Sequence, residues 1–311
     1  VIMNLRTILG NISVCKKDIL QFQPDTIIYI DYPGFNMRIA KWAKKLGIQN
    51  QYYISPQIWA WKENRIKEIK RDVDKMYVIL PFEKDFYEKK HHFPVEFVGH
   101  PLIDAISNRE KTTFGKFTAE NKLSQKPIIA LLPGSRKQEI EKMLSIMLSV
   151  VDKFSEYQFV IAGAPSQDYE FYKQFLTTEN VNFVSNKTYD LLSISHAALV
   201  TSGTATLETA LFKVPQIVCY KANRISYEIA KRIITLKFIS LVNLIMDKEV
   251  VKELIQKELN TKNLELELNK IISGNQRQEM LSQYEVLEQK LGGKGASSTT
   301  ADLIINAIKK H

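Results

Sequence analysis

This sequence is poor in the residues that build disulfides and metal sites. Its 311 residues include 2 cysteines, Cys15 and Cys219, and 5 histidines, and none of them follows the spacing of a zinc site. Two cysteines so far apart favour a reducing compartment, and we expect a cytoplasmic protein with no resident metal or cofactor. The chain also lacks a P-loop and a serine elbow, so metal-assisted hydrolysis and acyl transfer by a triad have no support.

Long apolar runs are absent as well. No stretch is long enough to span a bilayer, and no signal peptide is recognisable at the start of the chain. An amphipathic helix is nevertheless predicted there, with basic residues nearby. Its apolar face consists of Val1, Leu5, Ile8, Leu9 and Ile12. This face either packs on a protein core or lies at a lipid interface.

Positive charge is in excess. The chain has 43 Lys and Arg against 34 Asp and Glu, a net charge of +9. No helix-turn-helix, zinc or RNA-binding signature accompanies it, so we expect no nucleic-acid partner. Most lysines lie on predicted helix surfaces, as in the segment 65–71. An anionic substrate or an anionic membrane surface accounts for the remaining excess.

Strand-like apolar runs alternate with helical patterns, which is typical of parallel sheets covered by helices. The predicted strands are 26–30, 52–54, 76–80, 96–99, 128–132, 159–162, 182–185, 198–201 and 216–219, and after about residue 226 the pattern is entirely helical. The polar stretch 108–126 reads as a linker. We therefore predict two α/β Rossmann-like halves that face a cleft: residues 1–107, incomplete, and 108–274, with helices in 275–311 that return to the first half.

Two segments of the second half have the same construction, a strand followed by a turn of small residues and then a helix. They are Leu131-Leu132-Pro133-Gly134-Ser135-Arg136 and Leu199-Val200-Thr201-Ser202-Gly203-Thr204-Ala205-Thr206-Leu207-Glu208. A helix N-terminus presents free N–H groups to an anion, and small residues let a phosphate approach closely. The pair suggests a nucleoside diphosphate site, with Arg136 at the phosphates and Glu208 at the ribose. Two ordinary β-to-α turns are the alternative.

Other polar residues follow the strands of the first half. Asp31 comes directly after the strand 26–30, where it either accepts a proton from a substrate hydroxyl or caps the next helix. Trp59 and Trp61 follow another strand and either stack on sugars or fill a core between domains. His100 closes a third strand, and its position alone favours a structural role.

Six segments in this order carry a resemblance to a known family. They are Ile30-Asp31-Tyr32-Pro33-Gly34-Phe35-Asn36, Ser55-Pro56-Gln57-Ile58-Trp59-Ala60-Trp61, Leu80-Pro81-Phe82-Glu83, Phe97-Val98-Gly99-His100-Pro101, Leu132-Pro133-Gly134-Ser135-Arg136 and Ser202-Gly203-Thr204-Ala205-Thr206-Leu207-Glu208. Together they resemble the lipid A disaccharide synthases, membrane-associated glycosyltransferases of the GT-B fold. The resemblance extends over essentially the whole chain.

The resemblance implies an inverting transfer from UDP-2,3-diacylglucosamine to 2,3-diacylglucosamine 1-phosphate, which releases UDP. It places the candidate base at Asp31 and a further active-site residue at Asn243. The nucleotide-sugar residues it implies are Gly134, Ser135, Arg136, Ser202, Gly203, Thr204, Ala205, Thr206 and Glu208, and those of the acceptor or cleft are Asn36, Ser55, Trp59, Trp61 and His100. It also implies peripheral association with the inner membrane, and it is compatible with a homodimer.

Three positions depart from the family pattern. Gly34 stands where many relatives carry an acidic residue, and Val242 replaces a proline before Asn243. The Gly-rich segment with which the family normally begins is missing, and we expect about sixty residues to precede the matching part in relatives. Two alternatives stay open: another UDP-sugar enzyme of the same fold, similar to UDP-N-acetylglucosamine 2-epimerase, and a basic protein that binds membrane surfaces.

Overall fold

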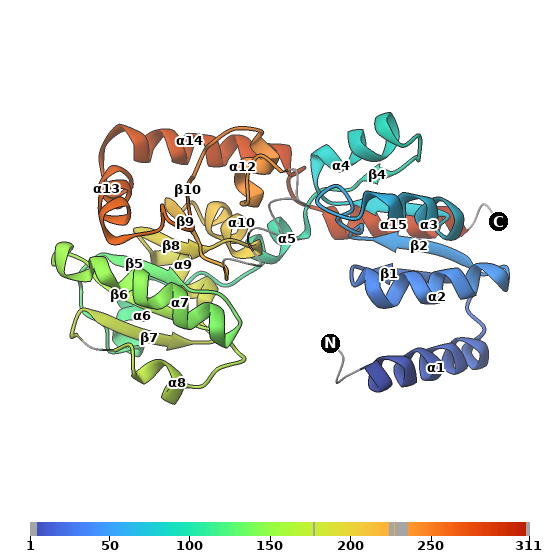
Figure 1. Cartoon of the computed structure of the whole chain (residues 1–311). Coiled ribbons are helices and arrows are strands. Elements are labelled where there is room, and N and C mark those ends of the chain that lie inside the picture. The colour runs from blue at the N-terminus through green and yellow to red at the C-terminus, as the bar shows by residue number, and fades with distance from the viewer. Residues whose placement is uncertain (1–4, 177, 224–226, 228–235, 309–311) are drawn as a thin grey trace. The chain divides into compact units, whose positions relative to one another are not determined.

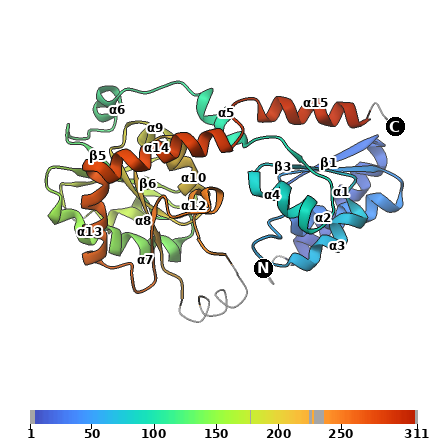
Figure 2. The same cartoon turned by 90° about the horizontal axis from the view of Figure 1, so that it is seen from above.

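The computed structural model describes residues 5–176, 178–223, 227 and 236–308. The chain forms two compact units, which Figures 1 and 2 show with their elements labelled. The first unit runs to Asp104 and resumes at Lys290, and the second runs from Ala105 to Gln289. The return to the first unit thus begins later than the expected residue 275, because α14 (Gly274–Lys290) packs within the second unit through Met280 and Tyr284.

The first unit is a parallel sheet in the order β1-β2-β3-β4 with helices on both faces. Its elements are α1 (Leu5–Phe22), β1 (Thr26–Ile30), α2 (Pro33–Lys45), β2 (Gln49–Tyr53), η2 (Glu63–Arg65), α3 (Ile66–Asp72), β3 (Lys75–Val78), α4 (Pro81–Asp85), η3 (Phe86–Lys90), β4 (Glu96–Phe97) and α15 (Ala296–Ile308), and α5 (Pro101–Ser107) crosses into the second unit.

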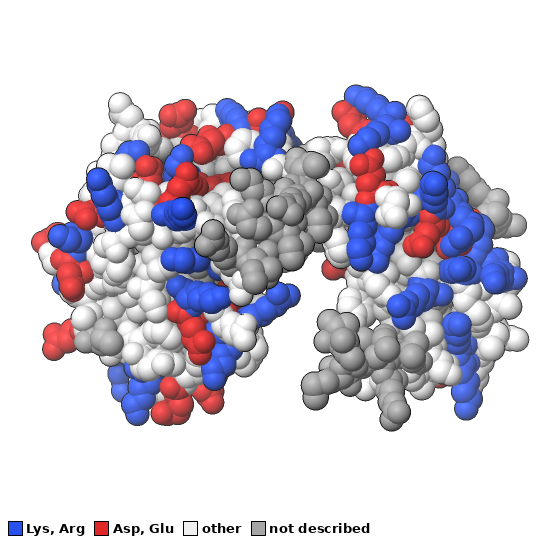
Figure 3. Space-filling view, in the orientation of Figure 1, with Lys and Arg blue, Asp and Glu red and all other residues white. Residues whose placement is uncertain are grey.

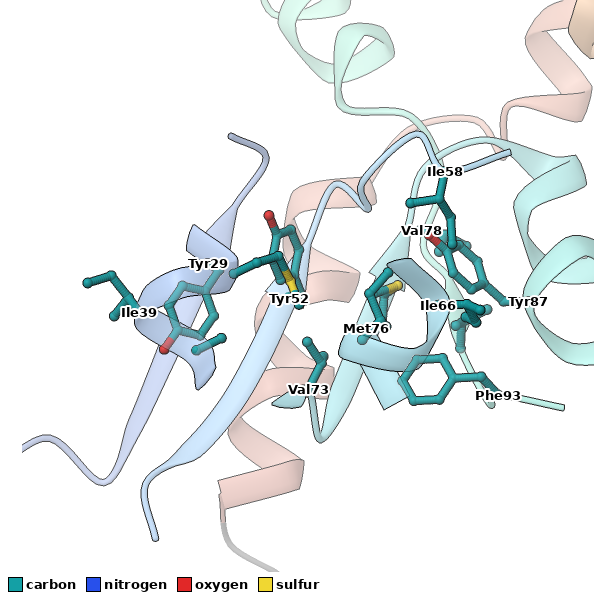
Figure 4. Close-up of a cluster of buried hydrophobic side chains, with 14 residues drawn as sticks. Tyr29, Ile39, Tyr52, Ile58, Ile66, Val73, Met76, Val78, Tyr87 and Phe93 are labelled. Carbon is teal, nitrogen blue, oxygen red and sulfur yellow. The ribbon is translucent and has the colours of Figure 1, made fainter. Parts of the chain in front are cut away.

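Alternation along the strands separates the two faces of this sheet, since successive side chains of a strand point in opposite directions. Tyr52 and Met76 lie in a core with residues of α2 and α3, part of which Figure 4 shows. Their neighbours Tyr53 and Tyr77 pack instead with Ile304 of α15. Helices far apart in the sequence therefore cover opposite faces of one sheet.

Helix α1 packs against the α2–α3 side of this core through Ile12, Cys15 and Ile19. This contact supports the core-facing alternative for that part of the helix. The rest of the predicted apolar face is not described: Val1 lies outside the described residues, as do the side chains of Leu5, Ile8 and Leu9.

The second unit is a six-stranded parallel sheet in the order β10-β9-β8-β5-β6-β7. Its elements are α6 (Phe114–Glu120), β5 (Ile128–Leu132), α7 (Lys137–Met147), η4 (Leu148–Lys153), β6 (Gln158–Gly163), α8 (Tyr169–Lys173), β7 (Val181–Ser185), α9 (Thr188–Ile194), β8 (Ala197–Thr201), α10 (Thr204–Leu211), β9 (Gln216–Tyr220), α12 (Leu241–Met246), β10 (Lys252–Ile255), α13 (Thr261–Ile272) and α14. Strands β5, β6 and β8 are buried along their whole length, as their apolar runs predict.

Two expectations about this unit are wrong. Helix α6 interrupts the predicted linker, and β10 lies in the region that the sequence pattern makes entirely helical. Glu253 breaks the apolar run of β10, which hides the strand in the sequence. Its carboxylate is nonetheless almost buried, because it accepts hydrogen bonds from the backbone N–H groups of Ile239 and Ser240.

Candidate functional site

The chain order of the strands reverses between β5 and β8 in the second unit. From β5 the chain continues outward to β6 and β7, whereas β8, β9 and β10 lie on its other side. In an open parallel sheet, ligands bind beyond the carboxyl ends of the strands at such a reversal. Both turns singled out in the sequence follow these two strands, so the topology brings them together.

A pocket of about 330 Å³ lies at this place. It is lined by the ends of β5, β6 and β8 and by the helices that follow: Leu132, Pro133, Gly134, Ser135, Glu139, Ala162, Gly163, Ala164, Pro165, Thr188, Thr201, Ser202, Gly203, Thr204, Ala205 and Glu208. These lining residues include two carboxylates but no Lys or Arg. An anion in the pocket would therefore depend on backbone N–H groups and on the N-terminus of α10.

Hydrogen bonds fix both turns. Ser202 donates from its hydroxyl to the carbonyl of Ile239 at 2.8 Å, and Thr206 donates to the carbonyl of Gly203 at 2.8 Å. In the other turn Gly134 has φ +104°, a conformation that disfavours residues with a side chain. The carboxylate of Glu139 accepts from the N–H of Ser135 at 3.3 Å. An acidic group thus sits over one of the amides that could receive a phosphate.

Glu208 is oriented from one side. Tyr189 donates from its hydroxyl to Oε1 of Glu208 at 2.6 Å. Burial, together with this hydrogen bond and the charge of Glu208, raises the pKa of Tyr189 above its ordinary value. The phenol therefore remains a donor to the carboxylate at neutral pH.

Three of the predicted nucleotide residues do not line this pocket. The side chain of Arg136 is exposed beside it, and Thr206 is fully buried. Asn243 is fully buried as well: its amide donates to Val251 O and to Glu253, while its oxygen accepts from the N–H groups of Val250 and Val251. These contacts occupy both ends of the amide, so Asn243 holds the connection from α12 to β10.

Several lining residues were not predicted from the sequence. Ala162 and Gly163 end β6, Ala164 and Pro165 follow it, and Thr188 begins α9; none of these side chains carries a chemical signal in the sequence. The residues at the end of β6 reach the pocket because β6 lies beside β5 in the sheet. Glu139 had a usable signal, because it stands three residues after Arg136, at the position where an acidic side chain can reach back to a helix start.

In the first unit, the predicted residues follow the carboxyl ends of the strands. Asp31 follows β1, and both Asp31 and Tyr32 have left-handed backbones, with φ of +46° and +44°. Two successive non-glycine residues in this region are unfavourable. The carbonyl of Asp31 accepts hydrogen bonds from Asn36 Nδ2 at 2.7 Å and from Tyr52 OH at 2.6 Å. These bonds hold the backbone that presents the Asp31 carboxylate, which is exposed.

The segment after β2 is fixed by Glu83, a buried carboxylate of α4. One oxygen accepts from Ser55 Oγ at 2.7 Å and from Trp59 Nε1 at 3.0 Å, and the other accepts from the N–H groups of Ile79 and Leu80. The polar groups of Ser55 and Trp59 thus form hydrogen bonds inside the protein. A ligand at this place would contact the apolar ring surface of Trp59, which packs edge-on against Phe82.

Trp61 and His100, the remaining residues predicted for the acceptor or cleft, differ in exposure. Trp61 is half exposed, with the amine of Lys62 4.4 Å from its ring centroid. His100 is buried, and burial lowers its pKa from 6.5 to about 4. Its Nδ1 accepts from the N–H of Leu102 at the start of α5, which agrees with the structural role that its position favours.

Two further features are absent from the residues that the structure describes: a group of metal ligands and a membrane-spanning helix. Among the residues described, no three His, Cys, Asp or Glu side chains are grouped as a metal site would require. No helix in the same ranges has the length and hydropathy needed to cross a membrane.

The fold and this pocket define a class: an α/β two-domain protein with the GT-B type of architecture. Solved structures with this fold include Staphylococcus aureus MnaA with UDP, at a TM-score of 0.66 and 14% identity over 98% of this chain and 80% of that one. Another is the UDP-GlcNAc 2-epimerase of Neisseria meningitidis bound to UDP-GlcNAc, at a TM-score of 0.64 and 16% identity over 98% and 81%. At such identities the likeness concerns the fold alone.

The family follows from sequence comparison. The lipid-A-disaccharide synthetase family model matches residues 1–305, and the chain belongs to this family. Lipid-A-disaccharide synthases of Coxiella burnetii (strain CbuG_Q212) and Syntrophus aciditrophicus are 36% and 38% identical over 99% and 98% of the chain, and over 82% of their own length. Synthase 1 of Legionella pneumophila (strain Philadelphia 1) is 38% identical over 93% of the chain and 77% of its own length. The chain is therefore a glycosyltransferase of lipid A biosynthesis, as the resemblance implies.

Proposed function

We propose that this chain joins UDP-2,3-diacylglucosamine to 2,3-diacylglucosamine 1-phosphate, with release of UDP. The observation that carries the proposal is the pocket in which Gly134, Ser135, Ser202, Gly203 and Glu208 come together. Its position at the strand reversal suits a nucleotide, and the family membership supplies the class of reaction. The structures of MnaA with UDP and of the epimerase with UDP-GlcNAc share this fold.

In this proposal the diphosphate lies against the turns and the start of α10, where N–H groups stabilise the charge that develops on the leaving group. Glu208 accepts hydrogen bonds from the ribose hydroxyls. The phosphate must displace the Glu139 carboxylate from the Ser135 N–H. Arg136, although it does not line the pocket, is exposed beside it and closes on the phosphates when they are bound.

Asp31 is proposed as the general base. It takes the proton of the acceptor's hydroxyl as that oxygen attacks the anomeric carbon of the donor. The bond from this carbon to the diphosphate breaks, UDP leaves with the electron pair, and the configuration is inverted. The exposed carboxylate and the hydrogen bonds that fix its backbone support this role.

Both substrates carry acyl chains, and we infer that the protein binds an anionic membrane surface peripherally. The first unit supports this inference through its charge: its sequence has 20 Lys and Arg against 13 Asp and Glu, whereas that of the second unit has 23 against 21. Basic side chains are prominent on the face of the first unit that Figure 3 shows. Such charge is attracted to anionic lipid headgroups.

An assay of UDP release tests the reaction. The chain is supplied with the diacylated donor and acceptor, and in parallel with UDP-N-acetylglucosamine alone. We expect UDP only from the diacylated pair. Conversion of UDP-N-acetylglucosamine with no transfer between the diacylated sugars would favour the epimerase-like alternative and overturn the proposal.

A further inference from the structure

Glu208 is part of a short series of contacts that extends away from the pocket. Tyr189 donates to its Oε1 but does not itself line the pocket, so its hydroxyl can affect a ligand there through Glu208. Its ring is enclosed from two sides: the ring of Phe212 lies at 5.3 Å between centroids, and the guanidinium carbon of Arg109 lies 5.3 Å from the Tyr189 centroid. The phenol is therefore fixed in place.

Arg109 also forms an ion pair with Asp190, the residue that follows Tyr189 in α9. Arg109 belongs to the segment with which the chain enters the second unit at Ala105. One arginine thus contacts two successive residues of α9, by its charge and by its planar face. It fastens the entering segment to the helix that orients Glu208.

We propose that Tyr189 is a positioning residue that holds Glu208 ready for the ribose of a nucleotide, and that Arg109 in turn holds Tyr189. The inference rests on the proposed function, since it takes this pocket as the nucleotide site. A hydroxyl–carboxylate hydrogen bond of 2.6 Å is strong and directional. It occupies Oε1 and leaves Oε2 for the ligand. Because the carboxylate is already ordered, less side-chain entropy is lost when the ribose binds.

Calorimetric titration of the full chain tests this with two ligands, UDP and its 2′,3′-dideoxy analogue, which lacks the ribose hydroxyls. Tyr189→Phe removes only the hydroxyl. We expect it to weaken UDP binding by roughly three- to tenfold, the usual effect of one typical hydrogen bond. The dideoxy analogue should bind the variant and the wild type equally. Arg109→Gln should weaken UDP binding by roughly two- to fivefold, and only while Tyr189 is present.

A double-mutant cycle separates positioning from a general effect on the pocket. In the Glu208→Ala background, Tyr189→Phe should cause no further loss of UDP affinity. Tyr169→Phe is the matched control, because Tyr169 is a half-exposed tyrosine of the same unit that packs on Phe183. The affinity of this control variant for UDP should equal that of the wild type.

Three results would overturn the inference. They are unchanged UDP affinity in Tyr189→Phe, an equal loss for the dideoxy analogue, and a further loss in the Glu208→Ala background. A wild-type chain that binds no UDP would instead overturn the proposed nucleotide site, and the inference would fall with it. The two failures are distinguishable because only the second affects the wild type.

Discussion

Four of the polar residues predicted from the sequence have two kinds of surroundings in the structure. Asp31 is exposed and Glu208 lines the pocket, and hydrogen bonds hold the backbone carbonyl of Asp31 and the carboxylate of Glu208. Ser55 and Asn243 are buried, with their polar groups bonded inside the protein. The first kind suits direct chemistry, and the second suits the support of a nearby backbone.

Replacing Asp31 tests the proposed base. Asp31→Asn keeps the shape of the side chain but removes its basicity, and turnover should fall about a hundredfold to ten-thousandfold. UDP affinity and thermal stability should stay close to wild type. The alternative that Asp31 caps α2 is wrong, because Tyr32 holds the N-cap position and no side chain caps this helix. If Asp31 had only a structural role in this turn, activity would survive in Asp31→Asn. Turnover of Asp31→Asn within a few-fold of the wild type would exclude Asp31 as the base.

Arg136 should affect phosphate binding even though it lies outside the pocket lining. Arg136→Ala should weaken UDP by about 2 kcal/mol, since the lost contact is a charge-assisted hydrogen bond. Uridine, which has no phosphate, should bind the variant as well as it binds the wild type. Equal affinities of variant and wild type for UDP, measured by calorimetry, would remove Arg136 from the site.

His100 should make stability depend on pH. Its folded pKa is lowered by burial to about 4, from 6.5, so the unfolded chain binds more protons between these values. Its contribution is present above pH 6.5 and is lost as the pH falls towards 4, by up to about 3 kcal/mol. His100→Asn keeps an acceptor for the Leu102 N–H without the titration. Unfolding midpoints measured from pH 7.5 to 4.5 should fall less steeply in this variant than in the wild type.

Among the elements, β10 and its approach depend most on a few polar contacts. Glu253 of β10 binds the N–H groups of Ile239 and Ser240, and Ser202 of the β8–α10 turn binds the Ile239 carbonyl. Asn243 joins Glu253 to the residues before β10. One side of the pocket is thereby supported by the chain from Ile239 to Glu253.

Asn243→Ala should therefore reduce stability first. It leaves the buried N–H of Val251 and the half-buried N–H of Val250 without an acceptor, and an unpaired buried N–H costs about 1–3 kcal/mol. UDP affinity should fall only as far as the β8–α10 turn is loosened, and it should recover when the protein is stabilised by an osmolyte. Full thermal stability together with lost UDP binding would show instead that Asn243 contacts the ligand.

For the molecule as a whole, charge is distributed unequally between the two units. The first unit has a net charge of +7 in sequence, from 20 basic and 13 acidic residues, and the second has +2, from 23 and 21. An excess of positive charge spread evenly over both units would favour solubility alone. An excess concentrated in one unit favours attraction of that unit to an anionic surface. The first unit is therefore the part that we expect at the membrane.

Membrane association should depend on salt. The chain should co-sediment with vesicles that contain anionic lipid at low ionic strength, and binding should fade as salt shortens the screening length from about 10 Å at 0.1 M. Neutral vesicles are the control and should bind little. Failure to bind anionic vesicles at low salt would contradict the electrostatic attraction, whereas retention at high salt would indicate apolar contacts.

The sequence by itself determined the class of fold, the family and most of the pocket. An apolar run such as Ile128 to Leu132 favours a buried strand, and a turn of small residues between strand and helix, as at Ser202 and Gly203, favours either an anion site or an ordinary turn. These features are local, since each depends on residues within a few positions of one another. Local patterns are what a single sequence records.

The tertiary structure decided which residues meet. The position of β6 beside β5 adds Ala162 to Pro165 to the pocket, and the burial of Asn243 assigns it to support. The hydrogen bond from Tyr189 to Glu208 joins two helices nineteen positions apart. Strand β10 was hidden because the charge of Glu253 breaks the apolar pattern, and only its buried N–H partners explain how that charge is tolerated. Such contacts depend on strand order and burial, which no local pattern contains.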